Sequence, residues 1–440
     1  MPPEPSTAST DGAPSAVVLA SEETPNPGSV PTDGPSYRRV LRNRPFFLLW
    51  LAQLVSQSGD YIFEVALLWL VLVLTGSAFA VALIVTGTIL PAVVLGPFLG
   101  VFVDRWDRRR TLLVTNVVQG VVVAALSVIV IAGVTTLGWL FVIVLMLGSG
   151  ATVVRVATNA YVPSVVTTAD LSPANSLLSV SGSTNAIVGL SLGGVLVALF
   201  GVTLPIEYDA VTFFAAAVLL LLISPTAGAR AGPAPTTASS FRSELSEGLA
   251  FIRAHRFMLE LIAIGVVVNF FGTGLAAMLA PYARFVLHGG AAVYGFLGAF
   301  FSVGALVGAG AMGRVDTRRT AGRYLFGGGT AAGVIVLGLG LVGSMPLALS
   351  LMIALGAGLA VTNIPISVLL QAKVPGRLLG RVGAAFSALV SVTGPVGPIF
   401  AGWLAQRWSV SGVFLLTGGV FVAVLGLGAV TMTSLRSIEY

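Results

Sequence analysis

The stretch Gly100-Val-Phe-Val-Asp104-Arg105-Trp-Asp-Arg108-Arg109-Arg110 decides the fold of this chain. It joins two apolar segments, 78–103 and 111–133, and each is long enough to cross the roughly 30 Å hydrocarbon core of a bilayer as a helix. Short loops rich in arginine lie on the cytoplasmic side of membrane proteins. The stretch therefore predicts two spanning helices that are connected at the cytoplasmic face.

The composition of the whole chain agrees with this prediction. Of the 440 residues, 56% are hydrophobic and 9% are charged, whereas an average soluble domain has about 25% charged residues. So few charges cannot coat a water-facing surface, which excludes a soluble enzyme, a disordered protein and a coiled coil. The absence of cysteine also excludes disulfides and thiolate metal ligands.

Apolar segments of similar length recur on both sides of the quoted stretch. We count twelve, so the chain is predicted to be an all-α membrane protein with twelve transmembrane helices rather than a barrel. Their approximate ranges are 46–74, 78–103, 111–133, 137–160, 173–200, 203–223, 257–282, 291–313, 324–343, 346–370, 381–405 and 410–432. Glycines within them, such as Gly304 and Gly356, are expected to allow close helix packing rather than to bind phosphate.

The basic residues decide the predicted orientation. With the N-terminus inside, most of the 23 basic residues fall in cytoplasmic segments, so both termini are predicted to be cytoplasmic. The formal net charge is +6. Because the arginines are divided among short loops that border the membrane, no binding to nucleic acid is expected.

Two polar segments divide the chain. Residues 1–36 are rich in proline and contain no basic residue, so we expect a disordered N-terminal tail. Residues 224–256 separate the sixth apolar segment from the seventh. The chain is therefore predicted to consist of an N-terminal six-helix half at 37–223 and a C-terminal six-helix half at 257–435.

The second part of the 224–256 linker has the pattern of an amphipathic helix. Phe241, Leu245, Leu249 and Ile252 recur at helical spacing, with charged residues between them. We expect this helix to lie on the cytoplasmic face of the membrane.

The two halves repeat in sequence at an offset of about 210 residues. Gly100 and Arg109 of the quoted stretch correspond to Gly310 and Arg319. Because six spans are an even number, the two halves have the same orientation. Parallel repeats are one of the designs of secondary transporters, and their substrates bind near the midplane between the repeats.

The quoted stretch resembles the cytoplasmic signature loop of the major facilitator superfamily, which has a glycine, three residues, Asp-Arg and then a basic cluster. The resemblance covers residues 38–435 and implies the major facilitator fold. It also implies a conformational role for the loop residues Gly100, Asp104, Arg105, Arg108 and Arg109. By the same resemblance, Asp104 should meet the end of another helix, for which the N-terminus of the eleventh span is the expected partner. Arg105 and Arg109 should pair with acidic groups across the two halves. These contacts are expected only when the cytoplasmic side is closed, so they stabilise the outward-open state. The copy in the second half has Arg314 in place of the aspartate.

A second motif resembles the antiporter signature of drug-exporting members of the superfamily. In the fifth span, Gly189 precedes the pair Gly193-Gly194, with Leu190 where the signature has proline, and the eleventh span repeats the motif with Gly397-Pro398. Further stretches resemble the branch of siderophore and macrolide exporters, namely Thr75-Gly76-Ser77, Ala174-Asn175-Ser176 and Tyr208-Asp209.

Charged residues inside the predicted spans are the candidates for chemistry, because a charge in a bilayer costs several kcal/mol. Asp60 lies near the middle of the first span, and Glu64 follows one turn later on the same face. Two carboxylates this close cannot both ionise cheaply. The pair is therefore a candidate for proton coupling or for binding a cationic substrate. Alternatively, both carboxylates have structural roles. Asp60 would then form hydrogen bonds with the backbone of a helix that is broken at Gly59, and Glu64 would lie near the outer interface.

Other polar residues in the predicted spans are weaker candidates for a role in transport. Arg155 in the fourth span is a candidate counter-ion or ligand of an anionic substrate group, or its side chain extends to the cytoplasmic interface. For Glu207 and Asp209 at the outer end of the sixth span we favour interface or packing roles. For Asn185, Asn269 and Asn363 we expect hydrogen bonds between helices.

The inventory of residues excludes several enzymes. His255 and His288 are the only histidines and Lys373 is the only lysine, so neither a His-Glu-x-x-His zinc motif nor a Walker A motif exists. No cofactor or metal is expected. Energy for transport must come from an ion gradient or from the gradient of the substrate itself.

The sequence thus predicts a proton-coupled antiporter that exports small hydrophobic or amphipathic compounds. The expected partners are the substrate, protons and the lipid bilayer, with the chain acting as a monomer. The branch resemblance and the arginine-rich, lysine-poor composition indicate a bacterial inner membrane. The alternatives are an importer or lipid transporter of the same superfamily and, from another class, a polytopic sensor or assembly subunit that does not transport.

Overall fold

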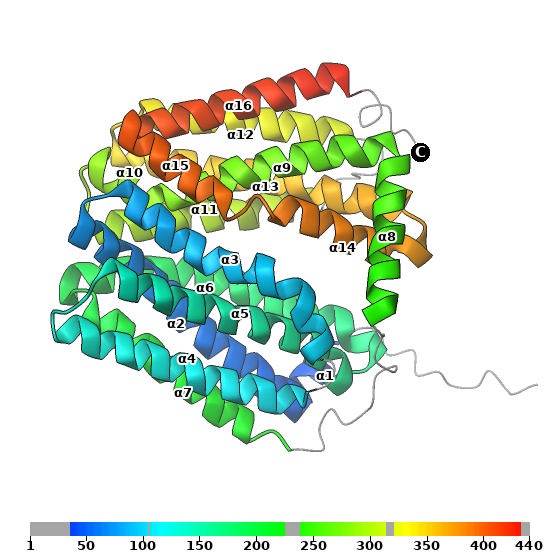
Figure 1. The fold of residues 1–440 in the computed structure, drawn as a ribbon, viewed down its shortest axis with the longest axis horizontal. Helices are drawn as coiled ribbons and strands as arrows, with labels where there is room; N and C mark the ends of the chain where they lie inside the picture. The colour runs from blue at the N-terminus through cyan, green and yellow to red at the C-terminus, as the bar shows by residue number, and fades with distance from the viewer. Residues whose placement is uncertain (1–35, 104–105, 225–237, 314–320, 433–440) are drawn as a thin grey trace, which may run out of the picture.

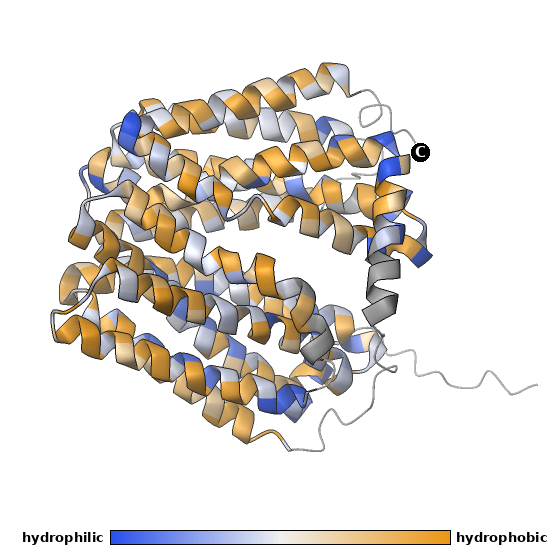
Figure 2. Cartoon of the chain, viewed as in Figure 1, coloured by the Kyte–Doolittle hydropathy of each residue, from blue (hydrophilic) through white to orange (hydrophobic). Residues whose placement is uncertain are grey.

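The computed structural model describes residues 36–103, 106–224, 238–313 and 321–432. All regular secondary structure within these ranges is helical. Among the described residues, twelve helices are long and apolar enough to cross a membrane. Figure 2 shows hydrophobic residues along most of their length, with hydrophilic residues gathered near the helix ends. These findings confirm the predicted all-α membrane architecture.

The helices follow the order of the predicted spans. The first half consists of the short α1 (Tyr37–Arg42), α2 (Arg44–Thr75), α3 (Ala78–Val103), α4 (Arg108–Ile131), α5 (Leu137–Val165), the 3-10 turn η1 (Thr168–Asp170), α6 (Leu171–Phe200) and α7 (Thr203–Leu221). After α8 (Ala238–Ala254), the second half consists of α9 (Arg256–Ala277), α10 (Leu279–Phe285), α11 (Ala291–Met312), α12 (Ala321–Leu341), α13 (Met345–Lys373), α14 (Gly376–Ser391), α15 (Val396–Arg407) and α16 (Val410–Thr431).

The two halves lie side by side and meet mainly along two pairs of helices. α6 packs on α11, and α3 packs on α15. The ribbons of the halves converge where α10 and α15 lie, and they diverge toward α8 (Figure 1). We call the end that holds α1, α8 and the start of α4 the basic end, because Arg38, Arg108 and Arg377 lie there. The other end is called the opposite end.

Glycines let the helices of each half approach closely. A Cβ atom on Gly304 of α11 would lie 2.0 Å from the carbonyl oxygen of Ile353 on α13. Likewise, a Cβ atom on Gly356 of α13 would lie 2.0 Å from the carbonyl oxygen of Phe301 on α11. Backbones this close leave no room for a side chain, which confirms the predicted packing role of these glycines.

Replacement of Gly304 by valine is expected to lower the melting temperature of the purified protein in detergent. The added side chain forces α11 away from α13, and overpacking of this kind costs about 1–3 kcal/mol. Gly310→Val on the same helix is the matched control, because a Cβ atom at Gly310 has no neighbour within 4 Å. Equal melting temperatures for the two variants would contradict this account of the packing.

The eleventh span is broken between α14 and α15, at residues 392–395. Pro395 lacks a backbone N–H and cannot continue the hydrogen-bond ladder. Side chains from other helices satisfy carbonyl groups around the break. Asn269 donates to the carbonyl oxygen of Val390 at 3.0 Å. The hydroxyl groups of Thr273 and Thr86 lie 3.0 Å and 3.1 Å from the carbonyl oxygens of Gly394 and Pro395, and each also lies 2.9 Å from a carbonyl oxygen of its own helix. In contrast, α6 runs without a break through Leu190, which occupies the place of the signature proline.

α8 crosses the basic end steeply relative to the spanning helices (Figure 1) and packs on α14. A Cβ atom on Gly248 would lie 2.6 Å from the carbonyl oxygen of Arg381, and Glu247 forms a salt bridge with the Arg381 side chain. Ile252 is buried in a cluster with Val382 and Ala385. The described part of this helix thus buries apolar residues against the second half, whereas the sequence analysis expected contact with lipid.

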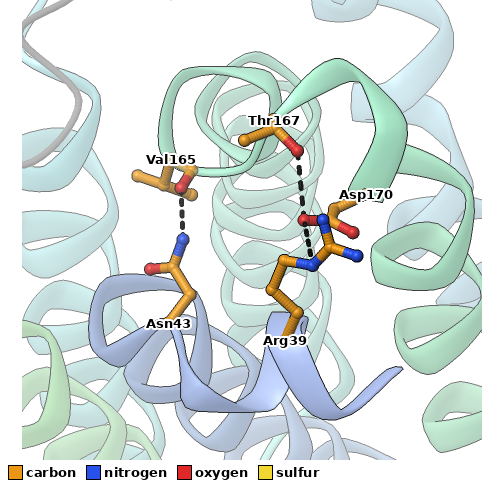
Figure 3. A network of polar contacts seen from close by, with 5 residues as sticks. All are labelled: Arg39, Asn43, Val165, Thr167 and Asp170. Carbon is orange, nitrogen blue, oxygen red and sulfur yellow. Dashed lines mark hydrogen bonds and ion pairs between the residues drawn. The ribbon is translucent and has the colours of Figure 1, made fainter. Parts of the chain in front are cut away.

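A polar network holds α1 and the start of α2 against the segment between α5 and α6 (Figure 3). Asn43 donates from Nδ2 to the carbonyl oxygen of Val165 at 2.6 Å, and its Oδ1 caps the N-terminus of α2. Arg39 lies 3.7 Å from the carboxylate of Asp170, which also accepts a hydrogen bond from Thr167 at 3.0 Å. These contacts connect α1, the start of α2 and the segment between α5 and α6, and they stabilise the packing of the first half at its basic end.

Candidate functional site

The candidate site begins with the two carboxylates of α2. Asp60 and Glu64 are both exposed, although they lie in the middle of a spanning helix. The other faces of α2 at this level are covered, because Tyr61 and Ile62 lie against glycines of α6 and Gly59 lies against α7. The exposed face therefore looks into the space between the two halves. Glu64 lines a cavity whose other described wall residues come mainly from the second half, which disagrees with the alternative that it lies near the outer interface.

Arg155 on α5 is exposed as well, and the helix geometry shows in which direction it points. It follows Gly148 by seven residues, which is two helical turns, so both lie on one face. A Cβ atom on Gly148 would lie 2.6 Å from the backbone of Thr88 on α3. The lipid-facing side of α5 carries the exposed Val142 and Met146 and lies on the far side of the helix. Arg155 thus points inward, and it forms no ion pair or hydrogen bond with another described residue.

The levels of Arg155 and Asp60 along the bundle can be compared through one hydrogen bond. Gln53 of α2 donates from Nε2 to Thr158 of α5 at 3.0 Å, and the two helices run in opposite directions. Asp60 lies seven residues after Gln53, and Arg155 lies three residues before Thr158. At 1.5 Å per residue, the two charged residues differ by about 6 Å in level. This is one turn, so the predicted counter-ion and Asp60 lie at nearly the same level of the first half.

A cavity of about 600 Å³ adjoins Glu64. Glu64 is the one charged residue among its described lining residues. The rest of the wall comes almost entirely from α9, α11, α13 and α14 and is mainly apolar. Its polar members are Asn269, Thr273, Tyr294, Ser302, Thr362 and Asn363. Such a wall fits a compound that is largely hydrophobic and carries a few polar groups.

The three asparagines predicted to join helices differ in their outcome. Asn185 donates to the carbonyl oxygen of Leu54 on α2 at 2.9 Å, and Asn269 donates across to α14. These two predictions are confirmed. Asn363 is exposed in the cavity and forms no hydrogen bond with another described residue, so the prediction is wrong there. The reason is that α13 turns this face toward the cavity rather than toward a neighbouring helix.

The two carboxylates of α7 are separated by their surroundings. Glu207 is exposed and accepts a hydrogen bond from Ser127 of α4 at 3.5 Å. Asp209 is only 1% exposed and packs against Gly59 of α2. The sequence analysis assigned both to packing or the interface and did not connect Asp209 with Asp60. Gly59, directly before Asp60, was the available sign of a close helix crossing.

The glycines of the antiporter-like motif have two structural tasks. Gly189 and Gly193 lie against α2 within the first half, and Gly397 lies against α9 within the second. In contrast, a Cβ atom on Gly194 would lie 2.8 Å from the carbonyl oxygen of Ala291 on α11, across the halves. The residue next to Gly397, Pro398, is buried in α15.

Gly402 of α15 is the equivalent of Gly194 in the second half. A Cβ atom on Gly402 would lie 2.7 Å from the side chain of Ala82 on α3. At the same end, Arg284 of α10 donates to the carbonyl oxygen of Leu72 at 3.0 Å, and Gln406 donates to Ser77 at 3.2 Å. These contacts cross between the halves and close the opposite end of the molecule.

The signature loop is only partly described. Gly100 lies near the end of α3, and Arg108 is the first residue of α4. Asp104 and Arg105 lie outside the described residues, so their predicted contacts stay predictions. Arg109 donates from Nε and Nη2 to the carbonyl oxygens of Leu220 and Leu221, both at 2.9 Å. In this conformation the guanidinium of Arg109 therefore caps the C-terminus of α7 in its own half. Its pairing across the halves, which is expected when the basic end is closed, stays a prediction.

Comparison with known proteins supports one family. Residues 38–439 match the family model described as transmembrane secretion effector. Macrolide efflux protein A of Streptococcus pyogenes is 24% identical over 86% of this chain and 94% of its own length. The multidrug efflux pump Tap of Mycolicibacterium fortuitum is 26% identical over 90% of this chain and 97% of its own length.

Solved structures agree on the fold. The nucleoside transporter NupG superposes with a TM-score of 0.71 at 12% identity and covers 90% of this chain and 100% of its own. A bacterial homologue of the human lysosomal transporter Spinster, in an inward-facing and occupied conformation, gives a TM-score of 0.70 at 13% identity and covers 92% and 97%. The chain belongs to the transmembrane secretion effector family of the major facilitator superfamily and is a membrane transporter, not an enzyme.

Proposed function

We propose that this transporter exports small hydrophobic or amphipathic compounds from a bacterial cell in exchange for protons. The observation that carries the proposal is the pair Asp60 and Glu64, which are exposed on the inner face of α2 beside the cavity. A carboxyl group in this position can bind a proton or a cation. Arg155 on α5 supplies a positive charge at nearly the same level.

The distribution of charge supports a cytoplasmic position of the basic end. Short arginine-rich segments stay on the cytoplasmic side of membranes, and α1, the start of α4 and the start of α14 all carry arginine. With this orientation, the halves are closed toward the outside and separated toward the cytoplasm. The described conformation is then the inward-open state, which takes up a compound from the cytoplasm or the inner leaflet.

The cavity supports the proposed substrate class. Apolar side chains from four helices of the second half would bind the hydrophobic part of a compound, and the exposed amide of Asn363 would bind a polar group. The carboxylate of Glu64 would pair with an amine. The names of the two efflux relatives fit the same class of cargo and the outward direction.

The arrangement of charges also supports an exchange mechanism. A protonated Asp60 or Glu64 is neutral and crosses between states at lower cost than a carboxylate. A cationic substrate favours the ionised form and so displaces the proton toward the cytoplasm. Substrate and proton thereby compete for the same carboxyl groups, which is the condition for antiport.

Everted inner-membrane vesicles with an acidic lumen would test this proposal, with ethidium as a lipophilic cationic probe. Vesicles that contain the protein are expected to accumulate ethidium, and the addition of ethidium is expected to release protons from the lumen. Nigericin, which collapses the pH gradient, should abolish accumulation. Accumulation that survives nigericin would refute proton coupling, and absence of accumulation would refute the proposed substrate class.

Replacement of Arg155 by alanine is expected to slow ethidium–proton exchange about fivefold. The substitution removes a positive charge that lies about one helical turn from Asp60 in level and would favour its ionised form. The attraction between two exposed charges of this kind amounts to at most about 1 kcal/mol, which corresponds to roughly a fivefold change. Arg155→Lys keeps the charge and serves as the control. Exchange at the normal rate in Arg155→Ala would return this residue to a purely interfacial role.

A further inference from the structure

We propose that Asp209 is a second, buried proton-binding site that exchanges its proton with Asp60 across the contact between α2 and α7. This inference rests on the proposed function and extends it, because it adds a storage site behind the exposed carboxylates. The step is a simple proton transfer. An O–H bond on one carboxyl group breaks while one forms on the other, directly or through one water molecule, and the total charge of the pair is unchanged.

The position of Asp209 is the first argument. Its residue is 1% exposed, and its carboxyl group lies against the backbone of Gly59, the residue directly before Asp60. A Cβ atom on Gly59 would lie 2.4 Å from Asp209 Oδ1 and 2.1 Å from Thr212 Oγ1. Any side chain at this position would therefore separate the carboxyl group of Asp209 from α2. The absence of one lets the carboxyl group of Asp209 lie against the residue that directly precedes Asp60.

The hydrogen bonds of Asp209 are the second argument. Thr212 Oγ1 donates to the backbone oxygen of Asp209 at 2.8 Å, and its distance to Asp209 Oδ1 is 3.4 Å. A hydroxyl group has one proton, so the shorter contact takes it. Asp209 Oδ2 is buried and has no hydrogen-bond partner among the described residues. A carboxylate in this position would be a buried charge without compensation, which is strongly unfavourable.

The charged and titratable groups around Asp209 are the third argument. α2 presents Asp60, which directly follows Gly59, and then Tyr61 and Glu64. α7 itself carries Glu207 and Tyr208, which are exposed. The spanning part of α4 beyond its first turn and the whole of α6 have no charged residue. The described helices that pack on α7 therefore offer Asp209 no cation in their spanning parts, whereas a proton neutralises it.

The difference in exposure between Asp60 and Asp209 would allow Asp209 to store a proton. Asp60 is exposed and exchanges protons with water in the space between the halves, while Asp209 is shielded from water. When a cationic substrate pairs with the α2 carboxylates, Asp209 keeps its proton in the first half. When the substrate leaves, Asp209 can pass that proton to Asp60.

Infrared spectroscopy on the purified full-length protein tests whether Asp209 carries a proton. At pH 7.5, the wild type is expected to show the C=O band of a protonated buried carboxylic acid. Asp209→Asn, which keeps the size of the side chain, should lose this band, while the neighbouring Glu207→Gln should keep it. An unchanged band in Asp209→Asn would overturn the proposal. If Asp209→Asn does not fold, ¹³C-aspartate labelling of the wild type decides, since absence of a shifted acid band would overturn the proposal equally.

Transport measurements test whether the proton at Asp209 takes part in coupling. In proteoliposomes with a pH gradient, Asp209→Asn is expected to reduce uphill ethidium transport at least tenfold, while downhill ethidium movement stays within twofold of wild type. Normal uphill transport by Asp209→Asn, together with its loss in Asp60→Asn, would overturn this inference alone. Normal uphill transport by both variants would overturn the proposed function as well.

Discussion

Replacement of Asp60 by asparagine is expected to abolish uphill transport driven by a pH gradient while the protein stays folded and inserted. Asparagine has nearly the same volume, and Asp60 is exposed, so no buried contact is lost. It cannot bind and release a proton, however, and the exposed end of the proposed proton pathway is removed. We expect at least a tenfold loss of ethidium accumulation in everted vesicles, whereas facilitated downhill movement continues.

Two further variants make this test specific. Glu64→Gln is expected to weaken ethidium binding as well as coupling, because Glu64 is the charged residue of the described cavity wall. Glu207→Gln removes an exposed carboxylate of α7 that lies outside this wall, and normal transport is expected. If Asp60→Asn and Glu64→Gln both accumulate ethidium at the wild-type rate, the carboxylates of α2 are not proton carriers.

Replacement of Gly194 by leucine is expected to shift the population toward the state that is open at the opposite end. In the described conformation, any side chain at this position meets the backbone of Ala291 and Ala292, both within 2.9 Å of the added Cβ atom. A clash of this kind costs about 2 kcal/mol. Because the clash exists only while α6 and α11 are in contact, it changes the ratio of the two states by roughly thirtyfold. Gly402→Leu should act in the same direction at the contact between α15 and α3.

Distances between spin labels would measure this shift. The chain has no cysteine, so label sites can be introduced without removing native ones. Arg110 and Arg377 are exposed at the basic end, and Val134 and Gly343 are exposed at the opposite end. Gly194→Leu should shorten the first distance and lengthen the second. Gly419→Val, where a Cβ atom has no neighbour within 4 Å, should leave both distances unchanged, and unchanged distances in Gly194→Leu would refute the account of the closed end.

The sequence was a good guide to the spans and a weaker guide to their breaks. Apolar length and arginine-rich loops indicate a helix wherever backbone groups must be satisfied within the bilayer. The interruption at residues 392–395 was not predicted. A proline interrupts a spanning helix only where donors from elsewhere can satisfy the carbonyl groups that lose their helical partners. Here Asn269 donates to Val390, and the hydroxyl groups of Thr273 and Thr86 lie within hydrogen-bond distance of Gly394 and Pro395; all three come from helices distant in the chain.

The candidate site was also predicted only in part from the sequence. Asp60, Glu64 and Arg155 could be identified from the sequence, because any charge inside a span is costly and so indicates a function. The relation of Asp209 to Asp60 could not be identified, since the two lie on helices that are separated by nearly 150 residues. Only the close crossing at Gly59 brings them together.

The sequence by itself determined that this is a twelve-span membrane protein, because the length and polarity of each span follow from local composition and the thickness of the bilayer. The major facilitator type was indicated by the resemblance of the stretch from Gly100 to Arg110 to the signature loop of that superfamily. The tertiary structure alone decided which end of the molecule is closed, which glycines join the two halves, and that Asn363 and Glu64 share a cavity. The physical reason is that spans of similar polarity can pack in many ways. The actual arrangement depends on small residues and hydrogen bonds that meet across helices.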